Sequence, residues 1–279
     1  MTSNTAMAKR QVLPWIGILG LSVVLGSACR PNDSVVDAPL TSPVGEGDPV
    51  TLLVGAAASL QGAMEDIQPA FEAAHPDIAL GYTFAASGQL QQQIEQGAPI
   101  DVFFSAGTSQ IEALEAGGYL RPDSRQNLLG NQLVLVVPST STLGLTEFND
   151  LTQAEVQQIS VGDFGSVPAG QYAEQVLGNL GILEDVRPKL IFANTVREVL
   201  AAVASNNVEA GILFATDAAT SDQVTVAAIA ANTLHDPIVY PVAVVNDTAH
   251  PEAALAWVDY LSSEAARAVF IDHGFTVLD

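Results

Sequence analysis

The sequence predicts an α/β protein of two lobes, each a mostly parallel sheet flanked by helices, with a ligand cleft between them. Short apolar runs rich in β-branched residues alternate with segments whose apolar residues recur at helical spacing, which is typical of such sheets. The alternation runs in two successive series, one from Val50 and one from about Asn131. A late apolar run at residues 239–245 can return to the first series.

The first series contains three predicted strands, each followed by a predicted helix. The strands cover residues 50–56, 78–86 and 100–107, and the second and third helices cover residues 87–97 and 109–118. The first helix ends at the His-Pro pair of residues 75 and 76, because proline cannot continue a helix. Its apolar face comprises Leu60, Ala63, Met64, Ile67, Phe71 and Ala74.

The second series has the same alternation. Its predicted strands are residues 132–138, 160–164, 209–215 and 224–230, and its predicted helices are residues 152–159, 167–181 and 194–206. The late strand then leads into two final helices, at residues 251–263 and 264–274. We therefore expect the first lobe at residues 50–131, the second at residues 132–240, and a return to the first lobe at residues 241–279.

The first 49 residues have the features of an export signal and a tether. Residues 1–28 hold a basic start, an apolar stretch and a run of small residues, which is typical of a signal peptide. Cys29, the single cysteine, follows directly and resembles the lipidated first residue of a bacterial lipoprotein. Residues 29–49, rich in Pro, Asp and Ser, then form a flexible tether. Plain secretion and a membrane anchor helix are the alternatives.

The charge balance excludes one class of partner. The chain carries 9 Lys and Arg against 31 Asp and Glu, a formal net charge of −22. A nucleic-acid-binding surface needs clustered cations, and the sequence contains no basic stripe. We therefore expect no nucleic-acid partner, and we interpret the acidity as a solvated, repulsive surface.

Small and hydroxyl residues mark the places where predicted strands pass into predicted helices. Ser59 and Ser87 each follow a run of alanines, Ala169 opens a helix in "VPAG", and Thr195 begins a capping box ahead of Val196. In open α/β sheets these junctions meet at the carboxyl ends of the strands, where helix N-termini also point. Several such ends would offer only hydrogen-bond donors, which suits an anion without protons.

Other interpretations remain for these residues. Each serine could simply be a helix N-cap, and Asp101, Asp163 and Asp217 could be caps or hinge contacts. The histidines are scattered without metal-ligand spacing, and neither a G-x-S-x-G elbow nor a Walker A sequence occurs. An exported hydrolase and a tethered adhesion or scaffold domain are the alternative functions, and we expect the chain not to be an enzyme.

Several motifs taken together resemble the molybdate-binding protein of bacterial ABC importers. They are "AAASL", "QIEQGAPIDVFFSA", "LLGNQLVLVVP", "VGDFGSVPAG" and "YPVAVV", spread over residues 50 to 276. The resemblance implies a two-lobed, type II periplasmic-binding-protein fold that closes on molybdate or tungstate without a cofactor. It also implies a monomer in the periplasm or at the cell surface, with a membrane permease and its ATPase as partners. A sulfate-binding protein of the same fold is the alternative.

The resemblance also implies a ligand set. The serine ligands of that family fall on Ser59 and Ser87, through hydroxyl and backbone amide, and its two amide ligands fall on Ala169 and Val196. A tyrosine hydroxyl is the usual fifth ligand, and this sequence has Phe214 at that position. Either a neighbour such as Thr216 compensates, or the site binds the ion with one donor fewer.

Overall fold

The computed structural model describes residues 49–278, which fall within one compact unit. The expected signal peptide, Cys29 and all of the tether except Pro49 lie outside the described residues. Within residues 49–278, no helix combines the length and the apolar character that a membrane span requires.

The first sheet has six strands in the order β11-β4-β10-β3-β1-β2. Its strands are β1 (Val50–Ala57), β2 (Ile78–Ala85), β3 (Val102–Phe104), β4 (Gln126–Gly130), β10 (Val239–Val244) and β11 (Thr276–Val277). The accompanying helices are η1 (Ala58–Leu60), α1 (Gln61–Ala74), α2 (Ser87–Glu95), α3 (Thr108–Ala116), α8 (Pro251–Leu261) and α9 (Glu264–Asp272). We call this sheet and its helices the first lobe.

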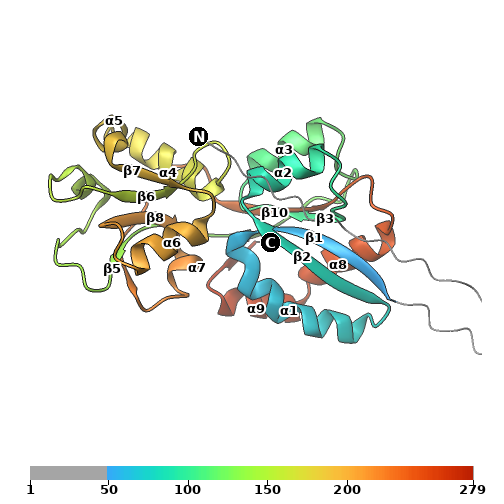
Figure 1. Ribbon diagram of the computed structural model, residues 1–279. Coiled ribbons are helices and arrows are strands. Elements are labelled where there is room, and N and C mark those ends of the chain that lie inside the picture. The colour runs from blue at the N-terminus through green and yellow to red at the C-terminus, as the bar shows by residue number, and fades with distance from the viewer. Residues whose placement is uncertain (1–48, 279) are drawn as a thin grey trace, which may run out of the picture. The chain divides into compact units, whose positions relative to one another are not determined.

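Helices cover both faces of the first sheet (Figure 1). Successive strand residues point to opposite sides, so a strand of consecutive apolar residues has apolar side chains to bury on each face. Phe103 of β3 packs with the apolar residues of α2 and α3 in one cluster. Its neighbour Phe104 packs with those of α1, α8 and α9 in the other, where Phe71 and Trp257 meet edge to face.

The second sheet has five strands in the order β7-β6-β8-β5-β9. Its strands are β5 (Leu133–Pro138), β6 (Ile159–Gly162), β7 (Leu190–Ala193), β8 (Ala210–Phe214) and β9 (Val224–Ile229). The accompanying helices are η2 (Phe148–Thr152), α4 (Pro168–Asn179), α5 (Leu183–Val186), η3 (Arg187–Lys189), α6 (Val196–Ala204) and α7 (Ala215–Ala218). This second lobe joins the first through the segments between β4 and β5 and between β9 and β10.

The expected α/β fold with two helix-flanked sheets is confirmed, but the sheets are mixed and not mostly parallel. In the first, β1 pairs in parallel with β2 and β3, whereas β10, β4 and β11 pair antiparallel. In the second, β6 pairs in parallel with β7 and β8, whereas β5 pairs antiparallel with β8 and β9. Strands β5 and β10 enter from the other lobe, so no helical crossover forces them to run parallel.

The expected helix at residues 152–159 is wrong. A short 3-10 helix, η2, ends at Thr152, and Gln153–Gln158 form turns and irregular backbone. Asp150 closes the preceding turn by accepting hydrogen bonds from the amides of Thr146 and Glu147. Val156 alone is buried between residues 153 and 158, so a helix here would have no apolar face to pack.

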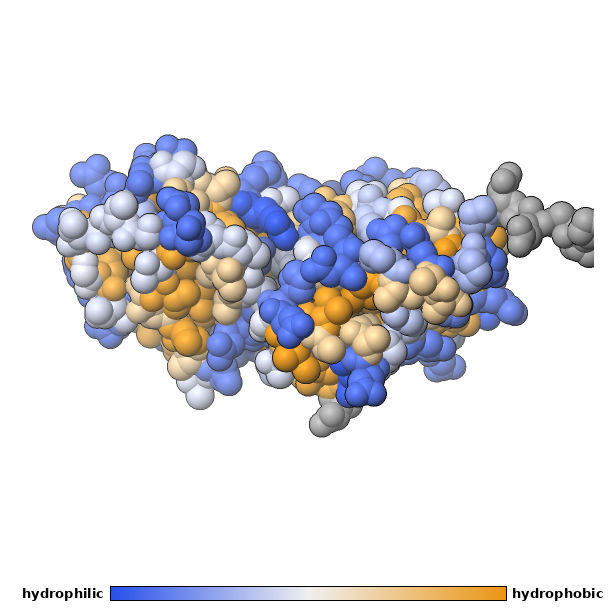
Figure 2. All heavy atoms as spheres, turned by 90° about the horizontal axis from the view of Figure 1, so that it is seen from below, coloured by the Kyte–Doolittle hydropathy of each residue, from blue (hydrophilic) through white to orange (hydrophobic). Residues whose placement is uncertain are grey.

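The sequence reasoning also missed β4, β7 and β11. They are short, at two to five residues, and β7 carries the exposed side chains Ile191 and Phe192 at an edge of its sheet. Figure 2 shows hydrophobic patches among hydrophilic residues on one face of both lobes. Much of the surface of any folded protein consists of apolar atoms, so exposed apolar side chains are normal for a globular surface.

Candidate functional site

Ser59 lies where β1 passes into η1. The three alanines before it are buried, so the chain is closely packed where the strand ends. Ser59 itself is 8% exposed, and its Oγ lies 3.1 Å from the hydroxyl of Tyr240 on β10. The serine is therefore held at the carboxyl end of β1 by a residue 181 positions further along the chain.

Ser87 lies at the equivalent place one strand along, as the first residue of α2. It is fully buried, and its Oγ accepts a hydrogen bond of 3.0 Å from the amide of Ala106. Neither serine is an N-cap: those positions are Ala57 and Ala86, and neither has a side-chain cap hydrogen bond. The N-cap interpretation of the two serines is therefore wrong, and both hydroxyls make tertiary contacts instead.

The second lobe presents two helix N-termini. Ala169 is the second residue of α4, and a Cβ at the adjacent Gly170 would lie 2.1 Å from the Gly162 carbonyl oxygen. Glycine thus lets α4 start directly against the end of β6. Val196 is the first residue of α6, where Thr195 Oγ1 accepts from the Glu198 amide at 3.2 Å, confirming the expected cap.

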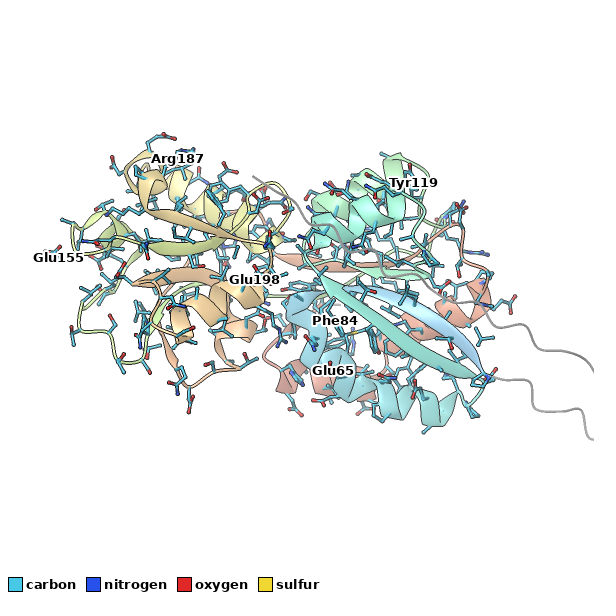
Figure 3. The ribbon with its side chains drawn as sticks, in the orientation of Figure 1. Glu65, Phe84, Tyr119, Glu155, Arg187 and Glu198 are labelled. Carbon is cyan, nitrogen blue, oxygen red and sulfur yellow. The ribbon has the colours of Figure 1, made fainter. Side chains whose placement is uncertain are left out.

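Glu198 completes the cap differently from an ordinary capping box. Its Oε2 accepts a hydrogen bond of 2.9 Å from the amide of Asn194, one residue before the N-cap. Figure 3 shows Glu198 near the start of α6, the helix that packs against η1.

One small cavity collects all the residues expected at the site: Ser59, Ser87, Ala169, Val196 and Phe214. Its volume is about 10 Å³, far below the roughly 300–1,000 Å³ typical of pockets for drug-sized ligands. The remaining lining residues are Ala57, Ala58, Ala85, Ala86, Ala106, Val167 and Pro168. The residues that line it have no titratable side chain, so neither a charged base nor a cation faces its contents directly.

The cavity is rich in free hydrogen-bond donors. The amides of Ser59, Ser87, Ala169 and Val196 all lie in the first turn of a helix, where a helix supplies no acceptor. Within residues 49–278 none of these four amides donates to another protein group. Two serine hydroxyls join them, so donors from both lobes surround one small volume.

Hydrogen bonds join the lobes around the cavity. The amide of Gly88 on α2 donates to the Ser166 carbonyl at 2.9 Å. Gln110 of α3 donates to Gln171 of α4 at 3.2 Å. The guanidinium Nε of Arg197 on α6 donates to the carbonyl of Ala58, the residue before Ser59, at 3.1 Å. Both lobes are thus held together around this cavity.

Arg197 is a basic side chain beside the helix ends that the sequence reasoning did not single out. It does not line the cavity, but it follows Val196 and binds the backbone beside Ser59. Its guanidinium also lies 3.9 Å from Asp217 of α7. Burial raises the pKa of Asp217 to about 7, although Arg197 opposes the shift. No local sequence pattern indicates this pair, because the two residues lie 20 positions apart.

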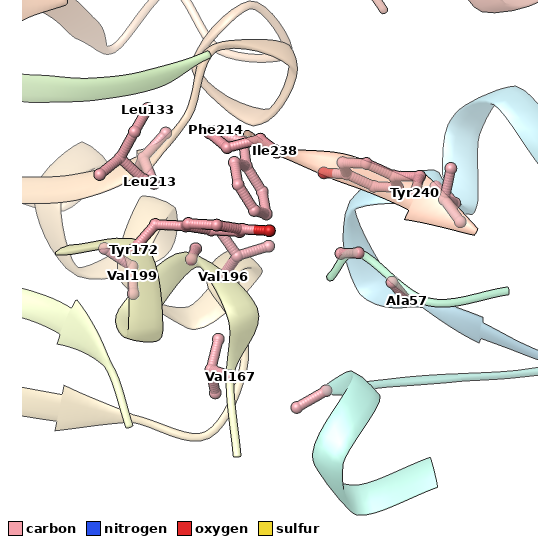
Figure 4. Packing of buried hydrophobic residues seen from close by; sticks show 14 of the residues in the cluster. Ala57, Leu133, Val167, Tyr172, Val196, Val199, Leu213, Phe214, Ile238 and Tyr240 are labelled. Atoms are coloured by element: carbon pink, nitrogen blue, oxygen red, sulfur yellow. The ribbon is translucent and has the colours of Figure 1, made fainter. Parts of the chain in front are cut away.

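Tyr240 and Asn131 were also missed by the sequence reasoning. Figure 4 shows the Tyr240 ring close to Phe214, with centroids 5.7 Å apart. Asn131 Nδ2 donates to the Tyr240 hydroxyl at 3.0 Å and to Thr216 Oγ1 at 2.9 Å. Thr216 is not among the lining residues, so it does not replace the hydroxyl that Phe214 lacks.

The remaining acidic candidates, Asp101 and Asp163, accept hydrogen bonds away from the cavity. Asp101 accepts hydrogen bonds from the Leu53 amide and the Thr248 hydroxyl, and Asp163 accepts from the Gly165 amide and the Ser166 hydroxyl. Neither aspartate lines the cavity. Residues 49–278 contain no group of three or more His, Cys, Asp or Glu that could hold a metal ion.

Comparison with known proteins gives the family and similar full-length relatives. The model of the bacterial extracellular solute-binding protein family matches residues 52–276. YvgL of Bacillus subtilis, named as a candidate ABC transporter substrate-binding lipoprotein, is 38% identical over 91% of this chain and 94% of its own. The molybdate-binding protein ModA of Escherichia coli is 37% identical over 81% of this chain and 89% of its own. These matches confirm the resemblance drawn from the motifs.

Solved structures agree on the fold. The periplasmic molybdate-binding protein of Azotobacter vinelandii superposes with a TM-score of 0.72 at 24% identity, covering 82% of this chain and all of that one. The sulfate-binding protein SubI of Mycobacterium tuberculosis superposes with a TM-score of 0.73 at 15% identity, covering 82% and 88%. The relatives are solute-binding proteins, which confirms that the chain is not an enzyme. It belongs to the family of bacterial extracellular solute-binding proteins.

Proposed function

We propose that this solute-binding protein of an ABC importer binds molybdate, and also tungstate, in the cavity between its lobes and delivers the ion to a membrane permease. The observation that carries the proposal is the chemistry of the cavity. Four free backbone amides and two serine hydroxyls surround a small volume, and the lining residues have no titratable side chain. Such a lining suits a small anion that carries no proton of its own.

The hydrogen bonds are sufficient without a cation. A hydrogen bond to a charged group contributes about 1.5–3 kcal/mol. Roughly six of them give on the order of 10–20 kcal/mol before the cost of association is subtracted. The remainder is compatible with a Kd near ~10⁻⁸ M. The net charge of −22 slows the encounter at low salt but does not prevent binding, because charges beyond about 10 Å are screened.

Relatives support molybdate over sulfate. The Escherichia coli protein, 37% identical, is named for molybdate, whereas the sulfate-binding protein shares the fold at 15% identity. Sulfate is also a tetrahedral anion without protons, so the donors alone do not distinguish the two. Only the size of the cavity can distinguish them, because the two ions differ in radius and not in proton content.

The decisive experiment compares oxyanions at matched ionic strength. We expect molybdate and tungstate to raise the melting temperature of the purified protein, because a ligand that binds only the native state stabilises it. Sulfate and phosphate serve as the matched controls. If sulfate raises the melting temperature by as much as molybdate does, the proposed ligand becomes a broader class of oxyanions. If no ion raises the melting temperature, the proposal is overturned.

Membership of an extracellular family places the protein in the periplasm or at the cell surface. We further propose that Cys29 is lipidated and anchors it to a membrane, which the lipoprotein name of the YvgL relative supports. Mass spectrometry of the protein from bacterial membranes should find a diacylated N-terminal cysteine. A Cys29→Ser variant should be released into the soluble fraction, and an unmodified Cys29 in membrane-free protein would contradict the proposal.

A further inference from the structure

A series of hydrogen bonds leads from the Gln132 amide through Asn131 and Tyr240 to Ser59, and the direction of each bond is defined. The backbone amide of Gln132 donates to Asn131 Oδ1 at 2.8 Å, which identifies that atom as the acceptor end of the side chain. Asn131 Nδ2 therefore directs its hydrogens elsewhere, one to Thr216 Oγ1 and one to the Tyr240 hydroxyl. The oxygen of Tyr240 thus accepts a hydrogen bond.

The proton of Tyr240 then has one destination. The side chain is fully buried, and burial raises the pKa of its hydroxyl well above the usual range, so the proton is present at neutral pH. Besides Asn131, Ser59 Oγ is the only hydrogen-bond partner of this hydroxyl within residues 49–278, at 3.1 Å. If the Tyr240 hydroxyl pointed its proton anywhere else, the proton would be buried without an acceptor, which is costly in free energy.

Ser59 consequently accepts from Tyr240 and keeps its own proton for another partner. Because Ser59 lines the cavity, that proton is available to a ligand there. The Ser87 proton is also left for a ligand, but for a different reason. Ser87 Oγ accepts a hydrogen bond from the Ala106 amide, a group that can only donate. Both serine hydroxyls are thus turned into donors by the groups behind them.

Resting on the proposed function, we propose that Tyr240 and Asn131 are positioning residues for anion selectivity, which fix Ser59 as a donor so that the cavity rejects protonated anions. A molybdate ion finds only donors. Hydrogen phosphate carries an O–H group that needs an acceptor. The Tyr240 hydroxyl occupies one of the two acceptor sites of Ser59 Oγ and leaves the serine proton directed at the ligand, so Ser59 meets hydrogen phosphate as a donor. The Ser87 direction is set by backbone, so the Ser59 direction is the one that a side-chain substitution can change.

A double-mutant cycle tests the coupling. Tyr240→Phe keeps the buried ring and removes the hydroxyl, and we expect the Kd for molybdate to rise about 5- to 10-fold. In a Ser59→Ala background the same substitution should change the Kd less than about twofold, since no hydroxyl remains to be oriented. Tyr172→Phe is the matched control: this buried tyrosine also packs on Phe214, but its hydroxyl contacts the Pro237 carbonyl. It should change the Kd less than twofold in both backgrounds.

The preference for molybdate over phosphate is a second readout. A substitution at Tyr240 that only loosened the packing would not change this preference. At pH 6, Tyr240→Phe should lower the ratio of the phosphate Kd to the molybdate Kd severalfold, because the Ser59 hydroxyl is then free to rotate and to turn an acceptor site toward the phosphate proton. If Tyr240→Phe does not fold, Asn131→Leu replaces it, with the same expected dependence on Ser59.

Equal losses in both backgrounds, or an unchanged phosphate-to-molybdate ratio, would overturn the inference while leaving the proposed function intact. If the unsubstituted protein binds no oxyanion, the proposed function fails first and the inference with it.

Discussion

The two lobes contribute to the cavity in different ways. The first lobe supplies Ser59 and Ser87, each with a backbone amide and a hydroxyl that another protein group orients. The second supplies the amides of Ala169 and Val196 and the phenyl ring of Phe214, which has no hydrogen-bonding group. The first lobe therefore holds more of the donors, and we expect it to capture the ion before the second lobe closes over it.

The lobes also differ in how they bury a carboxylate. Asp101 in the first lobe has a hydrogen-bond donor at both oxygens. Asp217 in the second lobe is 1% exposed, and its Oδ2 has no partner among the described residues. A buried carboxylate without donors favours its protonated form. The comparison shows that burial alone does not set the behaviour of an aspartate, because its hydrogen-bond partners decide how costly the charge is.

The largest expected effect follows from Asp217. Its pKa of about 7 in the folded chain lies above the ordinary value of 3.8, so the folded state keeps a proton that the unfolded state loses. The free energy of unfolding should therefore fall as pH rises from about 4 to about 7, by at most about 4 kcal/mol, and level off above that. Urea denaturation across this range measures it. Asp217→Asn should flatten this part of the profile, and an unchanged slope in that variant would assign it to other groups.

Closure of the second lobe over the first should be the next most sensitive step. A Cβ at Gly88 would lie 2.7 Å from the Cα and carbonyl oxygen of Ser166, which are backbone atoms that cannot rotate away. We expect Gly88→Ala to raise the Kd for molybdate about 100-fold, because the lobes cannot meet as they do here. Calorimetry measures the Kd, and Gly178→Ala is the control, since nothing lies within 4 Å of a Cβ at that helical glycine. Equal affinities in the two variants would show that this contact is not needed for binding.

The serine hydroxyls of the first lobe come next. Ser87→Ala removes one donor to the ion, so binding should weaken by about 1.5–3 kcal/mol, or some 10- to 100-fold. Thr195→Ala in the second lobe removes only the cap of α6 and should lower stability more than affinity. Titration calorimetry together with thermal melts of the free proteins separates the two. If Thr195→Ala lost more affinity than Ser87→Ala, the second lobe and not the first would contribute more to binding.

The smallest expected effect reduces the difference between the lobes. Phe214→Tyr gives the second lobe a hydroxyl at the cavity, and binding should tighten by up to about tenfold, the lower end of the range for one hydrogen bond to an ion. Phe214 is fully packed between Tyr172 and Tyr240, so the added oxygen must find room. Molybdate titration of the variant decides the matter, and weaker binding would show that the site is built around the phenyl ring.

Much of the fold could be predicted from local patterns. The sequence shows both an apolar face and the residues that end the helix for α1, α4, α6, α8 and α9. The short strands and the helix wrongly expected at residues 152–159 could not, because their structure depends on neighbours and caps supplied by tertiary contacts. The mixed direction of the sheets was also missed, since strand order is set by segments that cross between lobes.

The sequence by itself determined which residues stand at the helix N-termini. Small residues, hydroxyls and a capping box must stand at these junctions for a backbone to approach an anion, and such local requirements are visible in one dimension. The tertiary structure alone decided what orients them. Tyr240 meets Ser59 across 181 positions and Arg197 meets Ala58 across 139, and no local pattern predicts such pairs. A hydroxyl can accept or donate, so its role depends on the partner that folding brings to it.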